Sequence, residues 1–307
     1  MQSILPQWTL DAINSKPQGV TPPLDMREAI SQIRALPPLP GSALKIINLI
    51  ADPKADVDHL VEIVEYDPFL TAQIIRWASS SLYGYRGKIT TVHDAIIRVL
   101  GFNFVLDLAL GLAVLSPLKA PNDGVIGTRM FWIHALASCR LMLKLAERMP
   151  AETGINPQEV FLAGLLHNIG FPLMGHQFLN EFNQLETMIN ANPSLPIFHL
   201  ESFAFGVNHA QIGAWLMNTW SMPKMITDIV YHHHNPYYRG DNFKLNLLTY
   251  LNDYLLGLIG IGDAANQICY DDCWSLLGLE SVVGHEVLAL LGGEIEAITE
   301  MAEMLTH

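Results

Sequence analysis

Apolar residues recur along most of this chain at intervals of three and four, which is the spacing of a helix that packs on one side. One such segment follows Asp56, with apolar residues at positions 60, 61, 63 and 64. The dipeptide Asp67-Pro68 ends this segment and begins the next, because aspartate is favoured at a helix cap and proline at the first helical position. Alternating apolar and polar residues, which would indicate strands, are weak throughout. The pattern predicts an all-α fold.

Capping residues, prolines and glycines divide the chain into a series of short helices. Asn156-Pro157 begins one helix, and Gly170 is expected to end it. Gly101 is expected to separate a short helix from a very apolar one, and 81–87 is expected to be a loop. The expected helices are 25–34, 42–51, 57–66, 68–80, 95–100, 102–115, 130–149, 157–168, 176–191, 194–205, 208–219, 222–233, 243–260, 263–269, 272–277 and 284–305.

The segment 116–127 is the best candidate boundary between two helical halves, because it is rich in proline, asparagine, aspartate and glycine. We therefore expect an N-terminal helical lobe over 25–118 and a second lobe over 128–262. Residues 1–24, rich in proline, glutamine and glycine, form a lead-in, and 263–307 form a C-terminal helical extension. Glutamates at 294, 296, 300 and 303 predict one solvated face on the last helix, which would pack on the core or pair with a second copy.

Composition and charge exclude several classes of partner and location. Half of the residues are apolar, 15% are charged and the net charge is −13, with no block of lysine or arginine. Binding to a nucleic-acid backbone needs a basic face, so no nucleic-acid partner is expected. The three cysteines are too few for a disulfide framework and suggest a reducing compartment. The longest apolar run, 104–115, is interrupted by Asp107 and is too short to span a bilayer. With no secretory leader visible, we expect a cytoplasmic protein that does not enter membranes.

Histidines and one aspartate on the expected helices of the second half are candidates for metal binding. They do not have local chelating spacing, so the fold would have to bring them together. At most two of the three consecutive histidines 232–234 can face one point, because successive helical residues are about 100° apart. The histidines either hydrogen-bond within a cleft or retain a divalent metal such as Fe, Mn, Ni or Zn. The candidates are His134, His167, His209, His232, His233 and Asp253, and the family resemblance described below adds Asn168.

Their order, and the motif His167-Asn168, resemble the HD superfamily of metal-dependent phosphohydrolases, which includes the cyclic-di-GMP-cleaving HD-GYP branch. The first half resembles the HDOD domain, the HD-related output domain of bacterial signalling proteins. The resemblance covers about 26–220 and extends weakly to 260. It implies an all-helical, two-lobed fold, a bacterial source, and a family in which catalysis is mostly undemonstrated. The motifs that carry the HDOD resemblance are 36–40, 65–68, 78–83, 91–96 and 99–101.

The resemblance assigns His134, His167 and Asp253 to three of the superfamily's four metal-binding positions. Asn168 takes the fourth, which is normally an aspartate, so a neutral amide replaces a carboxylate. His209, and His232 or His233, match extra histidines of two-metal members.

The chain departs from the catalytic members in two further ways. Phe171-Pro172 follows Gly170 where catalytic relatives often have a lysine after the glycine, and the Gly-Tyr-Pro tripeptide of the cyclic-di-GMP branch is absent. We therefore expect a non-catalytic signalling protein that interacts with unknown signalling proteins, with a homodimer as one option. The alternatives are a metal-dependent phosphohydrolase acting on nucleotides or cyclic dinucleotides, and a small-molecule or metal sensor.

Overall fold

The computed structural model describes residues 36–306, and every regular element in that range is helical, which confirms the all-α prediction. The expected helix 25–34 and the lead-in 1–24 lie outside the described residues. The α-helices are α3 (Gly41–Ile50), α4 (Val57–Glu65), α5 (Pro68–Ala78), α6 (Val92–Ala95), α7 (Phe102–Leu115), α8 (Thr128–Ala146), α9 (Pro157–Leu166), α10 (Gly170–Gln177), α11 (Leu179–Ala191), α12 (Ile197–Phe205), α13 (His209–Thr219), α14 (Lys224–His232), α15 (Phe243–Leu258), α16 (Asp271–Ser275), α17 (Ser281–Gly292) and α18 (Ile295–Leu305).

Two helix starts that the sequence predicts, at Asp67 and Asn208, are capped by side-chain hydrogen bonds. The Asp67 carboxylate accepts from the backbone N–H of Phe69 at 3.0 Å, with Pro68 at the first helical position of α5. Asn208 begins α13 with a complete capping box, in which its side chain and that of Gln211 each accept a backbone N–H of the other. These local bonds satisfy N–H groups that would otherwise lack partners at a helix start.

Gly170 does not end a helix but begins α10, which corrects the expected boundary. A Cβ atom on Gly170 would lie 2.0 Å from the backbone oxygen of His209, so glycine is required where α10 crosses α13. The expected helix 176–191 is divided between α10 and α11 at Phe178, whose backbone has φ −132° and ψ 57°. Gly170 therefore permits close packing of α10 against α13, and the pattern of a single sequence carries no signal for such a contact.

Three further expectations are corrected. The segment 263–269 is not helical, and Asn266 there has φ 53°, outside the helical region. The segment 284–305 forms two helices, α17 and α18, which are separated around Gly293. Residues Ile96–Leu100 form a π-helical turn instead of an α-helical one, with the Gly101 N–H donating to the Ile96 oxygen at 2.8 Å. The expected loop 81–87 contains a short 3-10 turn, Ser81–Tyr83, and the remaining expected helices from residue 42 on are present, most of them with shifted ends.

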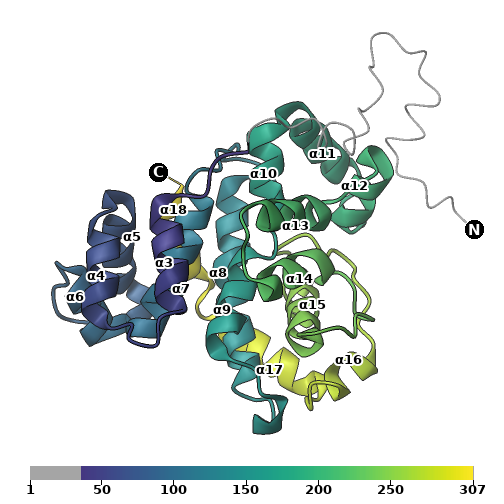
Figure 1. Cartoon of the computed structure of the whole chain (residues 1–307). Coiled ribbons are helices and arrows are strands. Elements are labelled where there is room, and N and C mark those ends of the chain that lie inside the picture. Colours follow the sequence, from purple (N-terminus) through teal and green to yellow (C-terminus); the bar gives the residue numbers. More distant parts are fainter. Residues whose placement is uncertain (1–35, 307) are drawn as a thin grey trace, which may run out of the picture.

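The helices are arranged in two lobes (Figure 1). Helices α3–α7 form the first lobe, and α8–α17 form the second, with α7 packed on α9 where the lobes meet. One continuous cluster of buried apolar side chains runs through both lobes. This continuous core does not separate the lobes into independent units. The domain boundaries at 118, 128 and 262 therefore stay predictions.

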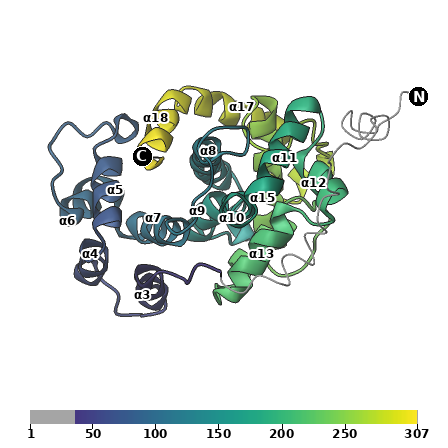
Figure 2. The same cartoon turned by 90° about the horizontal axis from the view of Figure 1, so that it is seen from above.

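The last helix, α18, returns from the second lobe to the first and lies beside α5 and α8 (Figure 2). The glutamates at 296, 300 and 303 are exposed, as expected of a solvated face, whereas Glu294 is half-buried. Glu303 pairs with Arg129 at 2.8 Å, and Glu294, just before α18, pairs with Arg140 at 2.9 Å. The C-terminal segment therefore packs on the core of its own chain.

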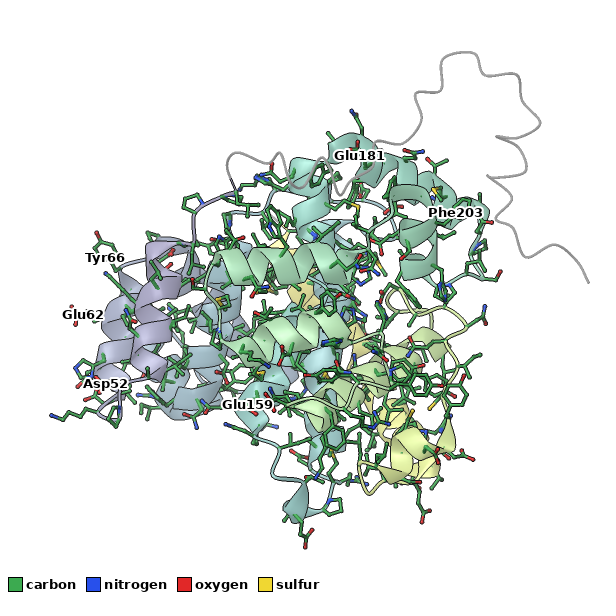
Figure 3. The ribbon with its side chains drawn as sticks, turned by 45° about the vertical axis from the view of Figure 1, so that its right-hand side comes forward. Asp52, Glu62, Tyr66, Glu159, Glu181 and Phe203 are labelled. Atoms are coloured by element: carbon green, nitrogen blue, oxygen red, sulfur yellow. The ribbon has the colours of Figure 1, made fainter. Side chains whose placement is uncertain are left out.

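Acidic side chains project from both lobes, including Asp52 and Glu62 on the first lobe and Glu181 on the second (Figure 3). The negative charge counted from the sequence is thus spread over the surface. Within residues 36–306, no helix has both the length and the apolar character needed to cross a bilayer.

Candidate metal centre

Helix ends from the second lobe bring a group of histidines and acids together in the protein interior. α9 ends at Leu166, so His167 and Asn168 lie in the short turn that precedes α10. His209 is the first residue of α13, and His134 and Asp253 come from the middle of α8 and α15. Each of these five side chains belongs to a residue that is at most 4% exposed. The fold therefore assembles the expected residues from separate helices.

The first cluster consists of His134, His167 and Asp253. Their facing ligand atoms all lie within 4.8 Å of one another, with the two histidine Nε2 atoms 2.9 Å apart. Oδ1 of Asp253 lies 3.4 Å from Nε2 of His134 and 3.3 Å from Nε2 of His167. Nδ1 of His167 must donate to the Ala163 carbonyl at 2.9 Å, because a carbonyl only accepts. In the neutral ring, Nε2 of His167 thus presents a lone pair to the cluster.

Burial and neighbouring charges have opposite effects on the pKa values in the first cluster. Burial by itself would raise the pKa of Asp253, but the adjacent His167 and His134 hold it below its usual range. Burial likewise works against protonation of His167, yet Asp253 raises the pKa of His167 above its usual value. The carboxylate is thus the charged anchor of the first cluster.

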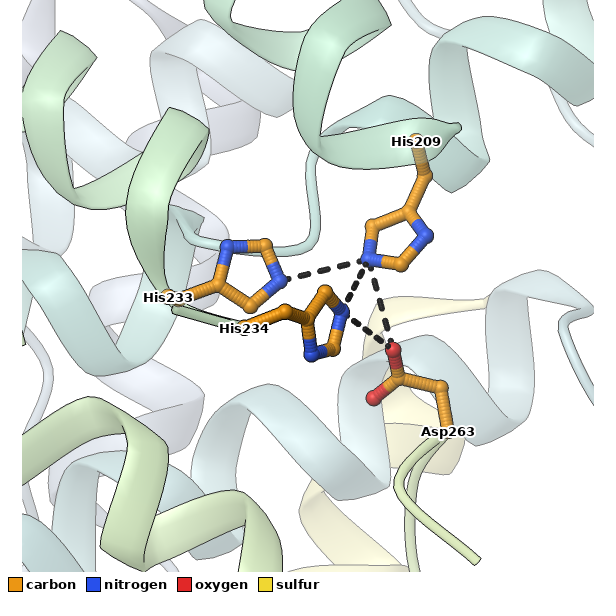
Figure 4. A group of neighbouring side chains, drawn as sticks. All are labelled: His209, His233, His234 and Asp263. Atoms are coloured by element: carbon orange, nitrogen blue, oxygen red, sulfur yellow. Dashed lines mark hydrogen bonds and ion pairs between the residues drawn. The ribbon is translucent and has the colours of Figure 1, made fainter. Parts of the chain in front are cut away.

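The second cluster consists of His209, His233, His234 and Asp263 (Figure 4). Nε2 of His209 lies 3.2 Å from Nε2 of His233 and 3.0 Å from Nε2 of His234. Oδ2 of Asp263 lies 3.3 Å from His209 and 3.1 Å from His234, both measured to Nε2. Burial alone would raise the pKa of Asp263, whereas His234 and His209 hold it well below its usual value.

Asn168 directly follows His167 of the first cluster and hydrogen-bonds to the second cluster. Its Nδ2 donates to Oδ1 of Asp263 at 3.3 Å, while its own Oδ1 is buried without a hydrogen-bond partner among the described residues. The amide therefore stabilises the negative charge of Asp263 through a donor that an aspartate at this position would lack.

His232 does not join the cluster, although it was among the candidates. Its ring stacks on Tyr238 with 4.0 Å between centroids. α14 ends at His232, and the following turn directs His233 and His234 into the site. Two of the three consecutive histidines, His233 and His234, take part, and the turn rather than helical geometry brings these successive residues together.

Three residues of the site were missed from the sequence: Glu201, His234 and Asp263. Glu201 is fully buried, and its carboxylate accepts the backbone N–H of His209 at 2.9 Å and contacts Nδ1 of the same ring at 2.6 Å. Burial opposes the charge on His209, but Glu201 raises the pKa of that ring. The histidine triplet was a signal for His234, whereas Asp263 lies in an irregular segment with no local pattern.

The site is closed. Phe171, at the position where catalytic relatives often carry lysine, stacks on His209 with 4.0 Å between ring centroids. The cavity lined by His134, Asn168, Phe171 and Asp263 has a volume of about 20 Å³. A single water needs about 10–15 Å³ by this measure, so the cavity holds a water or an ion and little else.

Comparison with known proteins identifies the family. The model of the HDOD domain matches residues 36–236, which is more than half of the chain. The chain belongs to the HDOD family. This confirms the family resemblance found in the sequence. The matched HDOD segment contains the histidines of both clusters, whereas Asp253 and Asp263 come from the chain beyond it.

Solved structures share the HDOD fold. A "Putative signal transduction protein" from Marinobacter aquaeolei VT8 is 33% identical with a TM-score of 0.84, over 92% of this chain and 65% of that one. An HDOD domain protein of unknown function from Geobacter sulfurreducens is 24% identical with a TM-score of 0.75, over 91% and 96% of the two chains.

An uncharacterized protein from Treponema pallidum (strain Nichols) is 24% identical over 69% of this chain and 40% of its own length. The HDOD chain thus spans less than two thirds of the Marinobacter and Treponema proteins.

The residues of this HDOD site are suited to a divalent metal. His134, His167 and Asp253 would hold an ion in the first cluster, where Oδ2 of Asp253 is buried without a hydrogen bond among the described residues. His209, His233, His234 and Asp263 would hold one in the second, with Glu201 orienting His209 as carboxylates orient metal-binding histidines elsewhere. A bound ion would supply Lewis acidity and positive charge at this buried position.

Proposed function

We propose that this HDOD chain is a regulatory protein that acts by binding signalling proteins and does not hydrolyse phosphodiesters. The observation that carries the proposal is the closed site: a cavity of about 20 Å³ admits no nucleotide. A phosphodiesterase must bring its substrate to the metal, and the Phe171 ring, which lines this small cavity, is stacked on His209 of the second cluster. The name of the Marinobacter relative, with its reference to signal transduction, agrees with this role.

The site chemistry supports the same conclusion. Two-metal hydrolysis places two cations close together, and a bridging anion reduces their repulsion. Asn168 supplies an uncharged amide there, and its N–H is engaged by Asp263. A single ion in either cluster would then have a structural role in this buried part of the lobe.

The alternative is a metal-dependent phosphohydrolase. It is favoured by one observation, the convergence of His134, His167 and Asp253 within 4.8 Å. Opening of the closed site would be needed before any substrate entered.

Activity assays separate these functions. Protein purified without an affinity tag is incubated with cyclic-di-GMP, nucleotides and bis-p-nitrophenyl phosphate, in the presence of Mn²⁺, Fe²⁺, Ni²⁺ or Zn²⁺. We expect no turnover above the protein-free control. Turnover that is abolished by His167→Ala and retained by the exposed control His285→Ala would establish the phosphohydrolase.

Protein binding is tested by chemical cross-linking in cells that naturally contain the chain, followed by mass spectrometry. We expect a signalling protein to be cross-linked reproducibly at defined surface residues, and its binding to be reproduced with purified components. If the purified chain binds none of the cross-linked proteins, the interaction half of the proposal is wrong.

A further inference from the structure

A second cavity lies away from the histidine clusters, where the two lobes meet. It is a surface groove of about 500 Å³ between the start of α7 and the start of α9, and Leu143 of α8 also lines it. We call it the α7–α9 groove. Its walls are mainly aromatic and aliphatic, and amide side chains lie among them. The residues used below are Phe102, Phe104, Asp107, Leu143, Gln158 and Phe161.

Asp107 is an unusual residue in this groove. It is only 3% exposed and lines the groove, yet its carboxylate forms no hydrogen bond or ion pair with any described residue. The other buried acids of the fold each contact a histidine, as Glu201 contacts His209. An unpaired buried carboxylate is costly unless something neutralises it. Burial alone raises the pKa of Asp107 to about 8.

Few ionisable groups surround Asp107. No other residue that lines the groove is ionisable. The lining residues from α9, which include Gln158 and Phe161, are uncharged. From α8, the buried Cys139 thiol is close enough for Asp107 to raise its pKa further, after burial. Arg140, also on α8, is already paired with Glu294 at 2.9 Å. The carboxylate thus has no cation of its own.

The backbone beside the groove is also irregular. The π-helical turn 96–100 ends at the groove, and Gly101 continues with φ 81°. π-helical turns occur frequently at functional sites because they displace side chains from their regular positions. Here the turn places Leu100 and Phe102 on the groove wall.

We propose that the α7–α9 groove binds a small monoamine, in which a primary ammonium group is carried on an apolar or aromatic stem. The ammonium would pair with the Asp107 carboxylate, and the stem would lie against Phe104, Phe161 and Leu143. Aromatic faces attract cations as well as apolar groups, so these walls suit both ends of the ligand. One acid in the groove matches one positive charge. This site is separate from the histidine clusters and does not depend on the function proposed above.

Proton balance gives the proposal a distinctive signature. At pH 7 the free groove holds the protonated acid, and the amine arrives as an ammonium ion. Forming the ion pair releases the carboxyl proton to solvent, and no other bond changes. The affinity for the amine should therefore rise nearly tenfold per pH unit up to about pH 8 and then level off. A ligand with a hydroxyl in place of the amine should show no such rise.

The test uses 2-phenylethylamine and its uncharged counterpart 2-phenylethanol, titrated against the full chain by ligand-observed NMR at pH 6, 7 and 8. At pH 8 we expect the amine to bind at least about tenfold more tightly than the alcohol, since hydrogen bonds to charged groups are strong. Asp107→Asn should remove this preference. Asp58→Asn, the same change at an exposed site on α4, should retain it.

Thermal unfolding confirms that Asp107→Asn is folded. As a measurement that needs no variant, the ¹³C resonance of the Asp107 carboxyl should titrate at lower pH when the amine is bound. Equal affinity for amine and alcohol, an amine preference that survives Asp107→Asn, or no binding of either compound would each overturn the proposal.

Discussion

Asn168→Asp restores the carboxylate that the superfamily normally carries, and we expect it to destabilise the metal-free protein. The wild-type amide donates to Asp263 Oδ1 at 3.3 Å, in an interior position where both residues are at most 4% exposed. The substitution removes this donor and places a second carboxylate beside Asp263. Like charges in a buried site repel each other strongly, and one of the two carboxyls must take up a proton to relieve the repulsion.

The magnitude follows from these contacts. Losing a hydrogen bond to a charged acceptor costs about 1.5–3 kcal/mol. Two unit charges at 3.3 Å repel by about 5 kcal/mol at an effective dielectric constant of 20, and proton uptake limits how much of this is realised. We therefore expect a loss of about 3–5 kcal/mol in the free energy of unfolding at pH 8. For a chain of 307 residues, the melting temperature should fall by roughly 5–8 °C.

The assay is thermal unfolding of tag-free protein in EDTA and in saturating Mn²⁺, Ni²⁺ or Zn²⁺. A cation between the two carboxylates would relieve their repulsion, so metal should stabilise Asn168→Asp more than it stabilises the wild type. Asn218→Asp, at an exposed position on α13, is the matched control and should shift the unfolding free energy by no more than about 0.5 kcal/mol. The reasoning fails if Asn168→Asp in EDTA melts together with Asn218→Asp.

Three further predictions concern other parts of the fold. Saturating Mn²⁺, Ni²⁺ or Zn²⁺ should raise the melting temperature of the wild type by a few degrees and that of His167→Ala by less, which differential scanning fluorimetry measures. Gly170→Ala should cost more than about 3 kcal/mol in urea unfolding, because its Cβ would lie 2.0 Å from the His209 backbone oxygen, whereas Gly41→Ala has open space and should be nearly neutral. The unfolded chain ionises Asp107 above about pH 4, but the folded chain retains the proton up to about pH 8, so wild-type stability should fall over this window. In Asp107→Leu, the loss of unfolding free energy between pH 5 and pH 8 should be smaller than in the wild type by roughly 2–4 kcal/mol, which urea unfolding at the two pH values would measure.

The sequence predicted what depends on neighbouring residues in the chain. The caps at Asp67 and Asn156 bind backbone N–H groups within three residues, so residue type and local spacing suffice to locate them. The order of His134, His167 and Asp253 was enough to expect a site through the family resemblance. Their convergence within 4.8 Å agrees with that expectation.

What the sequence did not predict depends on contacts between distant segments. Asp263 meets Asn168 across 95 positions, from a segment with no periodic pattern. Glycine is common at helix ends, but Gly170 is needed for the close approach of α13 to α10. Asp107 interrupts an apolar run in the sequence, but its burial beside a groove follows from the packing of the two lobes.

The charge balance of the site explains why an asparagine suits position 168. The three buried acids Glu201, Asp253 and Asp263 each contact at least one histidine. These contacts allow the clusters to share protons and remain stable without an ion. A fourth carboxylate at position 168 would exceed what the histidines neutralise and would make folding depend on metal. Asn168 therefore keeps the lobe stable whether or not a metal is bound, which is appropriate if the fold presents a surface to partners and unnecessary if its task is metal-dependent turnover.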